Sequence, residues 1–165
     1  MFQNAKKIKN HPGLKTALVT AVAVAALDQL TKLAIVGAMR PNQVIEAVPG
    51  LLDIVFFKNT GAAFGIFTDG GWVRTALLAA TSVAAIVVMG FLIYQSRSAL
   101  MTYALSLIVG GAAGNLIDRV RLGAVVDFIY FHAGKYYWPA FNVADSAITI
   151  GVFLALIAYM KEQRE

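Results

Sequence analysis

The sequence predicts an all-α membrane protein with four transmembrane helices, a small β-hairpin or sheet outside the membrane, and a loop near the membrane surface. Of its 165 residues, 59% are hydrophobic and only 14% are charged, and the mean hydropathy is +0.69. Soluble domains carry about 25% charged residues. Four apolar stretches are also long enough to cross the roughly 30 Å hydrocarbon core, which takes about 20 helical residues. We therefore expect one integral membrane domain over residues 1–165.

The expected helices are the apolar segments of spanning length, residues 15–39, 75–96, 98–117 and 141–160. Asp28 and Lys32 interrupt the first helix, whereas the second and third contain no charged residue. Because only Arg97 separates the second helix from the third, we expect these two to form a hairpin. Asp145 lies near the start of the fourth.

The first helix also resembles a cleaved signal peptide, with a basic start and small residues at Ala21-Val22-Ala23. The apolar pattern resumes after Lys32, which makes the whole segment long enough to span. A retained helix is therefore the favoured interpretation.

The first loop, residues 40–74, contains a strand pattern. Residues 43–48 and 51–57 carry β-branched and aromatic side chains around Pro49-Gly50, which is typical of a small hairpin on the membrane surface. The hairpin leads into residues 58–65, where two glycines permit a tight turn or a close backbone approach.

The second loop, residues 118–140, holds Asp127 and His132 and is rich in aromatic residues. Aromatic rings favour the membrane–water interface. We therefore expect this segment to be a loop that lies close to the membrane surface.

Lysine and arginine residues indicate the orientation. The 14 Lys and Arg divide evenly between the two sides of this topology, so their total decides nothing. The first helix usually dominates, and it follows a cluster of Lys6, Lys7, Lys9 and Lys15. We expect both termini in the cytoplasm and both loops outside it. The net charge of +5 fits anionic lipid headgroups, and we expect no nucleic-acid partner because no soluble basic domain is present.

Composition excludes several kinds of catalytic site. The chain has no cysteine, so disulfides, thiolate metal sites and cysteine nucleophiles are excluded. Its two histidines, His11 in the basic tail and His132 in the second loop, offer little for a zinc site or a Ser-His-Asp triad. Hydrolysis by this chain would therefore depend on carboxylates.

Asp127 and Asp145 are the strongest candidates for such chemistry. A charged residue at a bilayer centre costs roughly 2.5–3.5 kcal/mol, so a carboxylate kept at membrane depth indicates a function. If the two side chains meet, they cannot both ionise, and the pair holds one proton near neutral pH. The ionised member could then activate water while the protonated member assists an oxyanion. The structural alternatives are a surface-loop Asp127 and an Asp145 that caps the fourth helix.

Three further residues, Asn142, Asn115 and Arg119, have spacings that suit a shared pocket. Asn142 precedes Asp145 by three positions, and it either binds a substrate backbone or serves as a helix N-cap. Asn115 and Arg119 are four apart and could face one pocket. Arg119 otherwise pairs with Asp118 or a lipid phosphate. For Asp118 an ion pair with Arg119 is favoured over a role as a third catalytic carboxylate.

Two other features suit helix packing. Gly110 and Gly114 form a small-xxx-small pair that lets helices approach closely. Asp28 and Lys32 are four apart on the first helix, and a structural ion pair is favoured over a proton relay.

Five segments carry most of these polar residues, namely residues 28–32 (DQLTK), 59–65 (NTGAAFG), 111–119 (GAAGNLIDR), 125–128 (VVDF) and 141–145 (FNVAD). In this order they resemble the motifs of bacterial lipoprotein signal peptidase, also called signal peptidase II, an intramembrane aspartic peptidase. One such motif would be weak support, whereas five in the family's order are specific. The resemblance leaves out the tail before Lys15.

The resemblance implies a catalytic dyad of Asp127 and Asp145. Residues that would line the substrate pocket are Asn59, Asn115, Arg119 and Asn142. Residues that would support it are Asp28, Lys32, Gly111, Gly114 and Asp118.

The resemblance also implies the substrate and the compartment. The substrate would be a bacterial prolipoprotein, cleaved before a diacylglyceryl-modified cysteine. The enzyme would lie in the cytoplasmic (inner) membrane with its active site on the extracytoplasmic side. No metal or organic cofactor is implied, and we expect a monomer among membrane lipids.

Other classes of protein fit part of the sequence. A small four-helix transporter or channel would use Asp28, Lys32 and Asp145 as an ion path, and liposome flux without peptide cleavage would favour it. A non-catalytic assembly factor would pack through its third-helix glycines and tolerate loss of the Asp127 carboxylate. A Ser-Lys peptidase fits less well because Lys32 has Asp28 as its natural partner.

Overall fold

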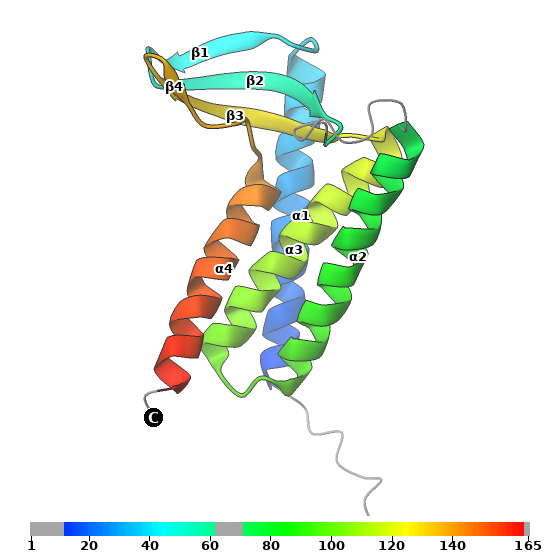
Figure 1. Ribbon diagram of the computed structural model, residues 1–165, viewed down its shortest axis with the longest axis vertical. Helices are drawn as coiled ribbons and strands as arrows, with labels where there is room; N and C mark the ends of the chain where they lie inside the picture. Colours follow the sequence, from blue (N-terminus) through cyan, green and yellow to red (C-terminus); the bar gives the residue numbers. More distant parts are fainter. Residues whose placement is uncertain (1–11, 62–70, 164–165) are drawn as a thin grey trace, which may run out of the picture.

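The computed structural model describes residues 12–61 and 71–163. Within these residues, four helices run side by side and a four-stranded sheet lies across one end of them (Figure 1). The helices are α1 (Pro12–Ala38), α2 (Gly71–Gln95), α3 (Ala99–Leu122) and α4 (Val143–Glu162). The strands are β1 (Val44–Val48), β2 (Leu52–Asn59), β3 (Val125–Ala133) and β4 (Tyr136–Tyr137). Each of these helices is long and apolar enough to span a membrane, so the predicted fold class is confirmed.

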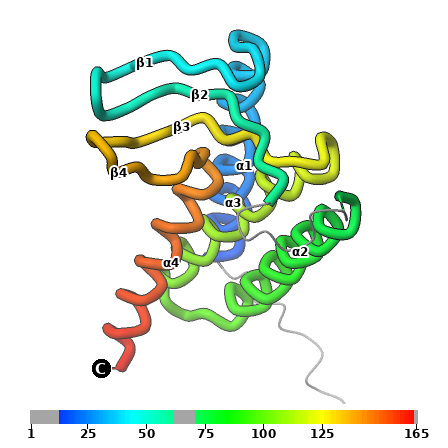
Figure 2. The backbone as a smooth tube through the Cα atoms, turned by 45° about the horizontal axis from the view of Figure 1, so that its top comes forward, coloured from blue at the N-terminus to red at the C-terminus, as the bar shows by residue number. Residues whose placement is uncertain are grey.

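Helix α3 is the centre of the bundle. It packs against α1, α2 and α4, and 61% of its spanning window is buried, against 22% or less for the other helices. Helix α1 begins and α4 ends at the end of the bundle away from the sheet (Figure 1). Figure 2 shows the sheet over α1 and α4, while α2 stands to one side. The expected hairpin of the second and third helices is confirmed, with residues 96–98 between them.

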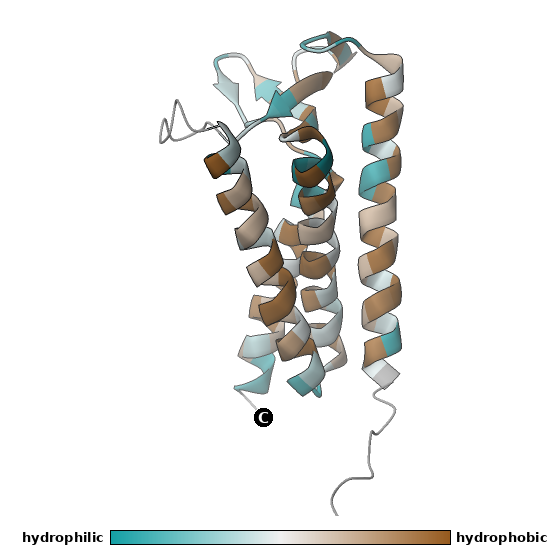
Figure 3. Ribbon diagram, turned by 90° about the vertical axis from the view of Figure 1, so that its right-hand side faces the viewer, coloured by the Kyte–Doolittle hydropathy of each residue, from teal (hydrophilic) through white to brown (hydrophobic). Residues whose placement is uncertain are grey.

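The outer surfaces of the helices are apolar. Large hydrophobic side chains such as Leu18, Val87 and Phe153 are more than half exposed. Figure 3 shows hydrophobic residues along the middle of the bundle, with hydrophilic residues mostly in the sheet and near the helix ends. An extended exposed apolar surface marks a contact with another phase or partner. Together with the four spans, it identifies a multi-pass membrane protein.

Glycines let α3 approach its neighbours. A methyl group at Gly110 would lie 2.7 Å from the Ala21 carbonyl oxygen of α1. A methyl group at Gly114 would collide with a side chain that also belongs to α1. A methyl group at Gly111 would overlap the Ala144 carbonyl oxygen of α4. Because Gly110 and Gly114 both face α1, the small-xxx-small interpretation is confirmed.

The sheet is antiparallel throughout, in the order β1-β2-β3-β4. The hairpin of β1 and β2 confirms the prediction for residues 43–57. The prediction that residues 118–140 form a loop is wrong, because residues 125–133 are strand β3, which pairs along β2 and contains His132. The first four residues of β3 are all buried, so they lack the polar–apolar alternation by which a strand is recognised.

Helix α3 is longer than expected. The expected end at residue 117 rests on the charges of Asp118 and Arg119, but both side chains find partners inside the bundle, Lys32 and Ser82 respectively. The helix continues to Leu122 and ends at Gly123. The φ of 69° at this glycine is the left-handed conformation of a C-terminal cap.

A β-bulge lies in the middle of β2. The register of β2 against β3 shifts between Ile54 and Phe57, so two consecutive residues, Val55 and Phe56, are both buried. Phe57 then lies opposite Asp127. The buried cluster that seats the sheet on α1 consists of Met39, Phe56 and Val126.

We expect Gly110→Ala to lower the stability of the protein, because the added methyl group would lie 2.7 Å from a backbone oxygen of α1. Overpacking of this kind typically costs about 1–3 kcal/mol. Gly90→Ala is the matched control, since a methyl group there meets nothing within 4 Å and alanine is favoured over glycine in a helix. Thermal unfolding in detergent measures both variants. A Gly110→Ala protein as stable as the wild type would contradict the close contact of α1 with α3.

Candidate active site

Asp127 lies in β3 and is only 3% exposed. Its Oδ1 accepts a hydrogen bond from Asn142 Nδ2 (2.8 Å), and its Oδ2 accepts one from Asn59 Nδ2 (2.9 Å). Asn59 pairs with Val125, two residues before Asp127, so the two side chains face the same side of the sheet. The alternative of a surface-loop Asp127 is therefore wrong.

Asp145 lies in the first turn of α4 and forms a capping box with Asn142. Asn142 Oδ1 accepts from the Asp145 N–H (3.0 Å), and Asp145 Oδ2 accepts from the Asn142 N–H (3.3 Å). The remaining oxygen, Asp145 Oδ1, accepts from Asn115 Nδ2 (2.8 Å). Both capping interpretations are thus correct for the local structure, and the cap holds the Asp145 carboxylate at the helix start.

The structure brings Asp127 and Asp145 together around Asn142. This side chain is 0% exposed, and its amide group donates to the carboxylate of Asp127 while its oxygen accepts from the backbone of Asp145. The amide nitrogen also lies 3.2 Å from the Val126 carbonyl oxygen and 3.3 Å from Asn115 Oδ1. With its oxygen and its nitrogen both engaged, Asn142 has one rotamer that satisfies all its partners. Asn142 therefore fixes the positions of the two aspartates relative to each other.

Burial raises the pKa of Asp127 to about 6, because the ionised carboxylate loses its water. The hydrogen bond from Asn59 lowers this pKa, the charge of Asp145 raises it, and Asn142 and the charge of Lys32 lower it by smaller amounts. An ordinary aspartate takes up its proton near 3.8. The pair of carboxylates can therefore share one proton only slightly below neutral pH, and that proton belongs to the pair.

A buried ion cluster stands next to the aspartates. Lys32 Nζ lies 2.8 Å from Asp28 Oδ2, 3.0 Å from Asp118 Oδ2 and 3.1 Å from Asn115 Oδ1. The Asp28–Lys32 ion pair is confirmed. The expected pairing of Asp118 with Arg119 is wrong, because consecutive residues leave a helix about 100° apart and Arg119 faces α2.

The two acids of this cluster also hold backbone groups. Asp28 Oδ1 accepts from the Ala144 N–H (2.9 Å), and Asp118 Oδ2 accepts from the Val126 N–H (3.0 Å). Ala144 directly precedes Asp145, and Val126 directly precedes Asp127. Each acid therefore positions the segment that carries one of the two aspartates.

The glycines of α3 leave room for this arrangement. At Gly114 an added methyl group would lie 2.5 Å from Asp28 Oδ2, so a larger residue would displace the carboxylate that holds α4. At Gly111 it would overlap the Ala144 carbonyl oxygen. Both glycines thus lie against the elements that position Asp145.

Arg119 borders the aspartates from the α2 side. Its Nη1 donates to Ser82 Oγ (3.2 Å), and its charge is near enough to interact with Asp127 and Asp145. Arg119 lines a cleft of about 540 Å³ between α2 and α3, together with Arg74. Asn115, four residues earlier on α3, faces Asp145 instead, so these two residues contact different neighbours.

Two residues of the site have no predicted role. Gln29 Nε2 donates to Asp118 Oδ1 (2.9 Å), and Ser82 accepts from Arg119. Gln29 lies inside the polar segment 28–32, which is a signal that could have found it. Ser82 lies beside Thr81 in an apolar helix, and nothing in the sequence distinguishes the two hydroxyl groups.

The arrangement suits acid–base chemistry with water. Two carboxylates that share a proton offer a base and an acid side by side, and fixed asparagine amides orient them. Within residues 12–61 and 71–163, no group of three or more His, Cys, Asp and Glu side chains could hold a metal ion. Residues 62–65 of the segment 59–65, the lysines at 6, 7 and 9, and His11 lie outside the described residues.

Comparisons with known proteins point to one family. The family model described as "Signal peptidase (SPase) II" matches residues 20–161. The chain is 48% identical over 149 residues to a lipoprotein signal peptidase of Azoarcus sp. (strain BH72), which covers 87% of this chain and 82% of that protein. It is 44% identical over 146 residues to one of Syntrophotalea carbinolica, with 88% and 91% covered. A solved structure of a bacterial membrane enzyme matches with a TM-score of 0.79 and 36% identity, covering 89% of this chain and 94% of that one.

We expect Asn59→Ala to raise the pKa of Asp127 above about 6, because the lost hydrogen bond stabilises the ionised carboxylate. Asn59→Asp raises it further, since it adds a negative charge while keeping an acceptor for the Gly61 N–H. Carbon-13 NMR of labelled aspartate in micelles measures the midpoint, and Asp127→Asn identifies the signal. A midpoint that stays in place in Asn59→Ala would contradict the role given to this hydrogen bond.

Proposed function

The chain belongs to the signal peptidase II family of lipoprotein signal peptidases, and we propose that Asp127 and Asp145 are its catalytic pair. It is an aspartic peptidase that removes signal peptides from prolipoproteins. The observation that carries the proposal for the pair is the contact of both aspartates with the buried Asn142. This contact joins a strand residue to a helix residue 18 positions later in the chain.

The proposed reaction begins with a water molecule between the two carboxyl groups. The ionised carboxylate takes a proton from this water as its oxygen attacks the carbonyl carbon of the scissile peptide bond. The protonated carboxyl group donates its proton to the carbonyl oxygen. When the gem-diol intermediate collapses, the C–N bond breaks and the amine receives the proton that the pair holds. A hydroxyl group of the intermediate returns its proton to the other carboxylate as the product carboxyl group forms, so the pair again holds one proton.

The protonation state needed for this reaction is favoured by the burial of Asp127. Burial raises the pKa of Asp127 to about 6, whereas Asp145 lies at the partly exposed start of α4. An enzyme that needs one neutral and one ionised carboxyl group loses activity when both are ionised at high pH and when both are protonated at low pH.

The remaining residues are proposed to bind substrate or to position the pair. Substrate contacts are assigned to Asn59, Asn115, Arg119 and Asn142. Asn142 and Asn115 already bind the carboxylates, so their substrate contacts would be made while they orient the pair. Positioning is assigned to Asp28, Lys32, Gly111, Gly114 and Asp118, which contact the segments that carry the two aspartates or leave room for them.

The proposed substrate is a prolipoprotein with a diacylglyceryl-modified cysteine, cleaved just before that cysteine. Two features support a lipid-anchored substrate. Asp127 lies in β3 and Asp145 in the first turn of α4, and these elements meet where the sheet lies across the end of the apolar bundle (Figures 1 and 3). Three exposed aromatic residues of the same sheet region suit the membrane–water interface, Tyr136, Tyr137 and Trp138.

We propose that both termini face the cytoplasm and that the aspartates lie on the opposite side of the cytoplasmic (inner) membrane. The start of α1 and the end of α4 lie at the same end of the bundle, which supports placing both termini on the same side of the membrane (Figure 1). We also propose that the enzyme is a monomer, since one chain by itself brings Asp127, Asn142 and Asp145 into contact.

We expect Asp127→Asn and Asp145→Asn each to lower kcat for cleavage of a diacylglyceryl prolipoprotein by at least about 10³-fold, since each removes one of the two acid–base groups. Gel-resolved cleavage by purified protein in detergent measures this. Both variants retain the size and much of the hydrogen bonding of the native side chain, so membrane insertion persists.

The matched control is Asp53→Asn, which removes a carboxylate from the same sheet. Asp53 pairs with His132 at 3.1 Å and takes no part in the aspartate site, so this variant cleaves at the wild-type rate. Appreciable cleavage by either Asp127→Asn or Asp145→Asn would refute the pair.

A further inference from the structure

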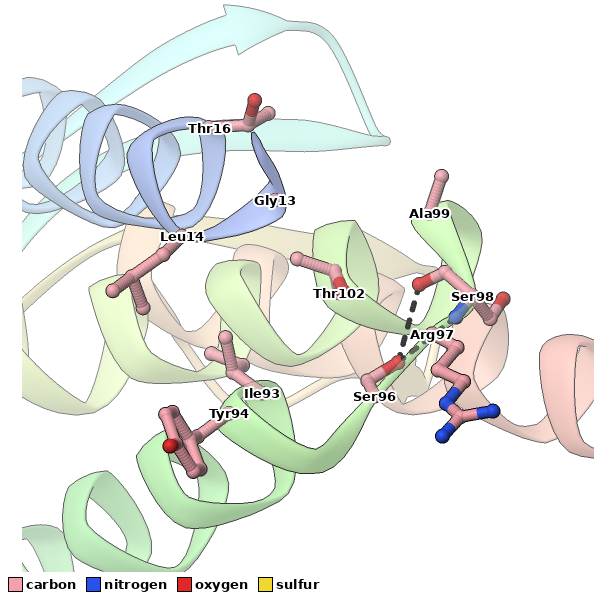
Figure 4. Close-up of a pocket in the computed structure, with 10 residues that line it drawn as sticks. All are labelled: Gly13, Leu14, Thr16, Ile93, Tyr94, Ser96, Arg97, Ser98, Ala99 and Thr102. Atoms are coloured by element: carbon pink, nitrogen blue, oxygen red, sulfur yellow. Dashed lines mark hydrogen bonds between the residues drawn. The ribbon is translucent and has the colours of Figure 1, made fainter. Parts of the chain in front are cut away.

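The turn between α2 and α3 borders a hollow of about 500 Å³ at the end of the bundle away from the sheet. Figure 4 shows Leu14 of α1 and Ile93 of α2 on its apolar side, with Ser96, Arg97 and Ser98 at the turn. Asp127 in β3 and Asp145 in the first turn of α4 lie at the sheet end of the bundle, so this hollow has no part in the proposed peptidase site (Figure 1).

Arg97 is an exposed cation between two hollows. Within the described part of the chain, its guanidinium group makes no ion pair or side-chain hydrogen bond. On its other side lies a second hollow of about 450 Å³, which Lys161 and Glu162 of α4 help to line. Figure 4 shows its guanidinium group pointing away from Leu14 and Ile93, so its five N–H donors stand open at the edge of the first hollow.

The charge and the position of this end suit an anionic lipid. Among the described residues here, Lys15, Arg97 and Lys161 are basic and Glu162 is acidic. Arg97 joins two membrane-spanning helices, so its guanidinium group lies at the level of the headgroups. Arginine binds phosphate through paired N–H groups, and basic pockets between transmembrane helices bind anionic headgroups.

We propose that the 500 Å³ hollow binds an anionic glycerophospholipid of the adjacent leaflet. The phosphate binds at Arg97, and an acyl chain runs along Leu14 and Ile93 toward the exposed apolar face of α1. A soluble phosphate lacks the chain that these apolar residues would contact. This site is independent of the proposed catalytic pair.

Native mass spectrometry of delipidated protein in detergent, titrated with dioleoylphosphatidylglycerol, tests the proposal. We expect wild-type protein to bind this lipid and Arg97→Gln to bind it at least about tenfold more weakly, the effect of losing a charged hydrogen bond. Arg97→Lys keeps partial affinity, and Arg97→Glu abolishes binding. Arg40→Gln is the matched control, an exposed arginine at the sheet end with the same change in charge, and it binds as the wild type does.

Two further binding measurements, with a neutral lipid and with inorganic phosphate, identify the ligand. Dioleoylphosphatidylcholine has the same chains without net charge, and equal binding of this lipid would overturn the requirement for an anion. Inorganic phosphate at millimolar concentration leaves the lipid-bound fraction unchanged, and its displacement of the lipid would assign the site to a free anion. Equal loss of binding in Arg97→Gln and Arg40→Gln would overturn the site. Cleavage by Arg97→Gln in lipid-free detergent stays at the wild-type rate, which reports an intact fold.

A second inference concerns Ser82, a buried polar residue on the side of α2 that packs against α3. Only Ser82 and Ile93 are buried among the described residues of α2. Ser82 Oγ donates to the Leu78 carbonyl oxygen (3.1 Å) and accepts from Arg119 Nη1 (3.2 Å). The backbone bond orients the hydroxyl so that its lone pairs meet the guanidinium group.

The geometry points to Ser82 as a positioning residue for Arg119. A single neutral acceptor on the α2 side holds the guanidinium group while leaving most of its donors open, and its charge lies near both aspartates. This inference rests on the proposed role of Arg119 in substrate binding. Without the hydroxyl, the side chain samples rotamers that no longer present it to the substrate.

Steady-state cleavage kinetics test this role. We expect Ser82→Ala to raise KM about three- to tenfold with kcat little changed, because a substrate contact is loosened in ground state and transition state alike. Ser82→Thr restores KM. Thr81→Ala is the matched control, since the Thr81 hydroxyl also bonds the Leu78 carbonyl oxygen (2.8 Å) but is exposed and away from Arg119.

The variant Arg119→Gln tests the substrate role of Arg119 separately from the positioning role of Ser82. If Arg119→Gln leaves KM unchanged, the proposed substrate role of Arg119 is wrong. If Arg119→Gln raises KM and Ser82→Ala does not, Ser82 has no positioning role. In the Arg119→Gln background, Ser82→Ala adds nothing further, because the two residues act through one contact.

Discussion

The ammonium group of Lys32 is the interaction on which the site depends. It lies within 3.1 Å of Asp28, Asp118 and Asn115, which come from α1 and α3. Each of the two acids then binds a backbone N–H next to a candidate catalytic residue, on α4 and on β3. A single buried charge thus connects the elements that carry the two aspartates, even though it touches neither of them.

Such a cluster is costly to bury, which explains how completely it is satisfied. Desolvation of an ion in a protein interior costs several kcal/mol, and it is offset only when each remaining donor and acceptor finds a partner. Lys32 meets this requirement with three oxygen partners, and Asp28 and Asp118 with both an ion pair and N–H donors. Close helix packing makes these contacts possible, since glycines on α3 bring α1 and α4 near enough.

The aspartate pair joins two kinds of local structure. A bulge in β2 precedes the point where Asp127 and Asn59 share a face of the sheet, and a capping box fixes Asp145 at the start of α4. Asn142 serves as the helix cap and binds Asp127 as well. An ordinary capping motif therefore also fixes the positions of the two carboxyl groups relative to each other, while burial raises the pKa of Asp127 to about 6.

The sequence by itself determined the spanning helices and the β1–β2 hairpin, and it was enough to propose Asp127 and Asp145, because hydrophobic length, turn residues and charges at membrane depth can be read from neighbouring residues. Only the tertiary structure decided that residues 125–133 form a strand, that α3 continues past its charges, and that Asp118 binds Lys32 rather than the adjacent Arg119. It also decided that Asn142 reaches Asp127. These outcomes depend on pairing between segments far apart in the chain, where burial and the direction of each side chain outweigh sequence proximity.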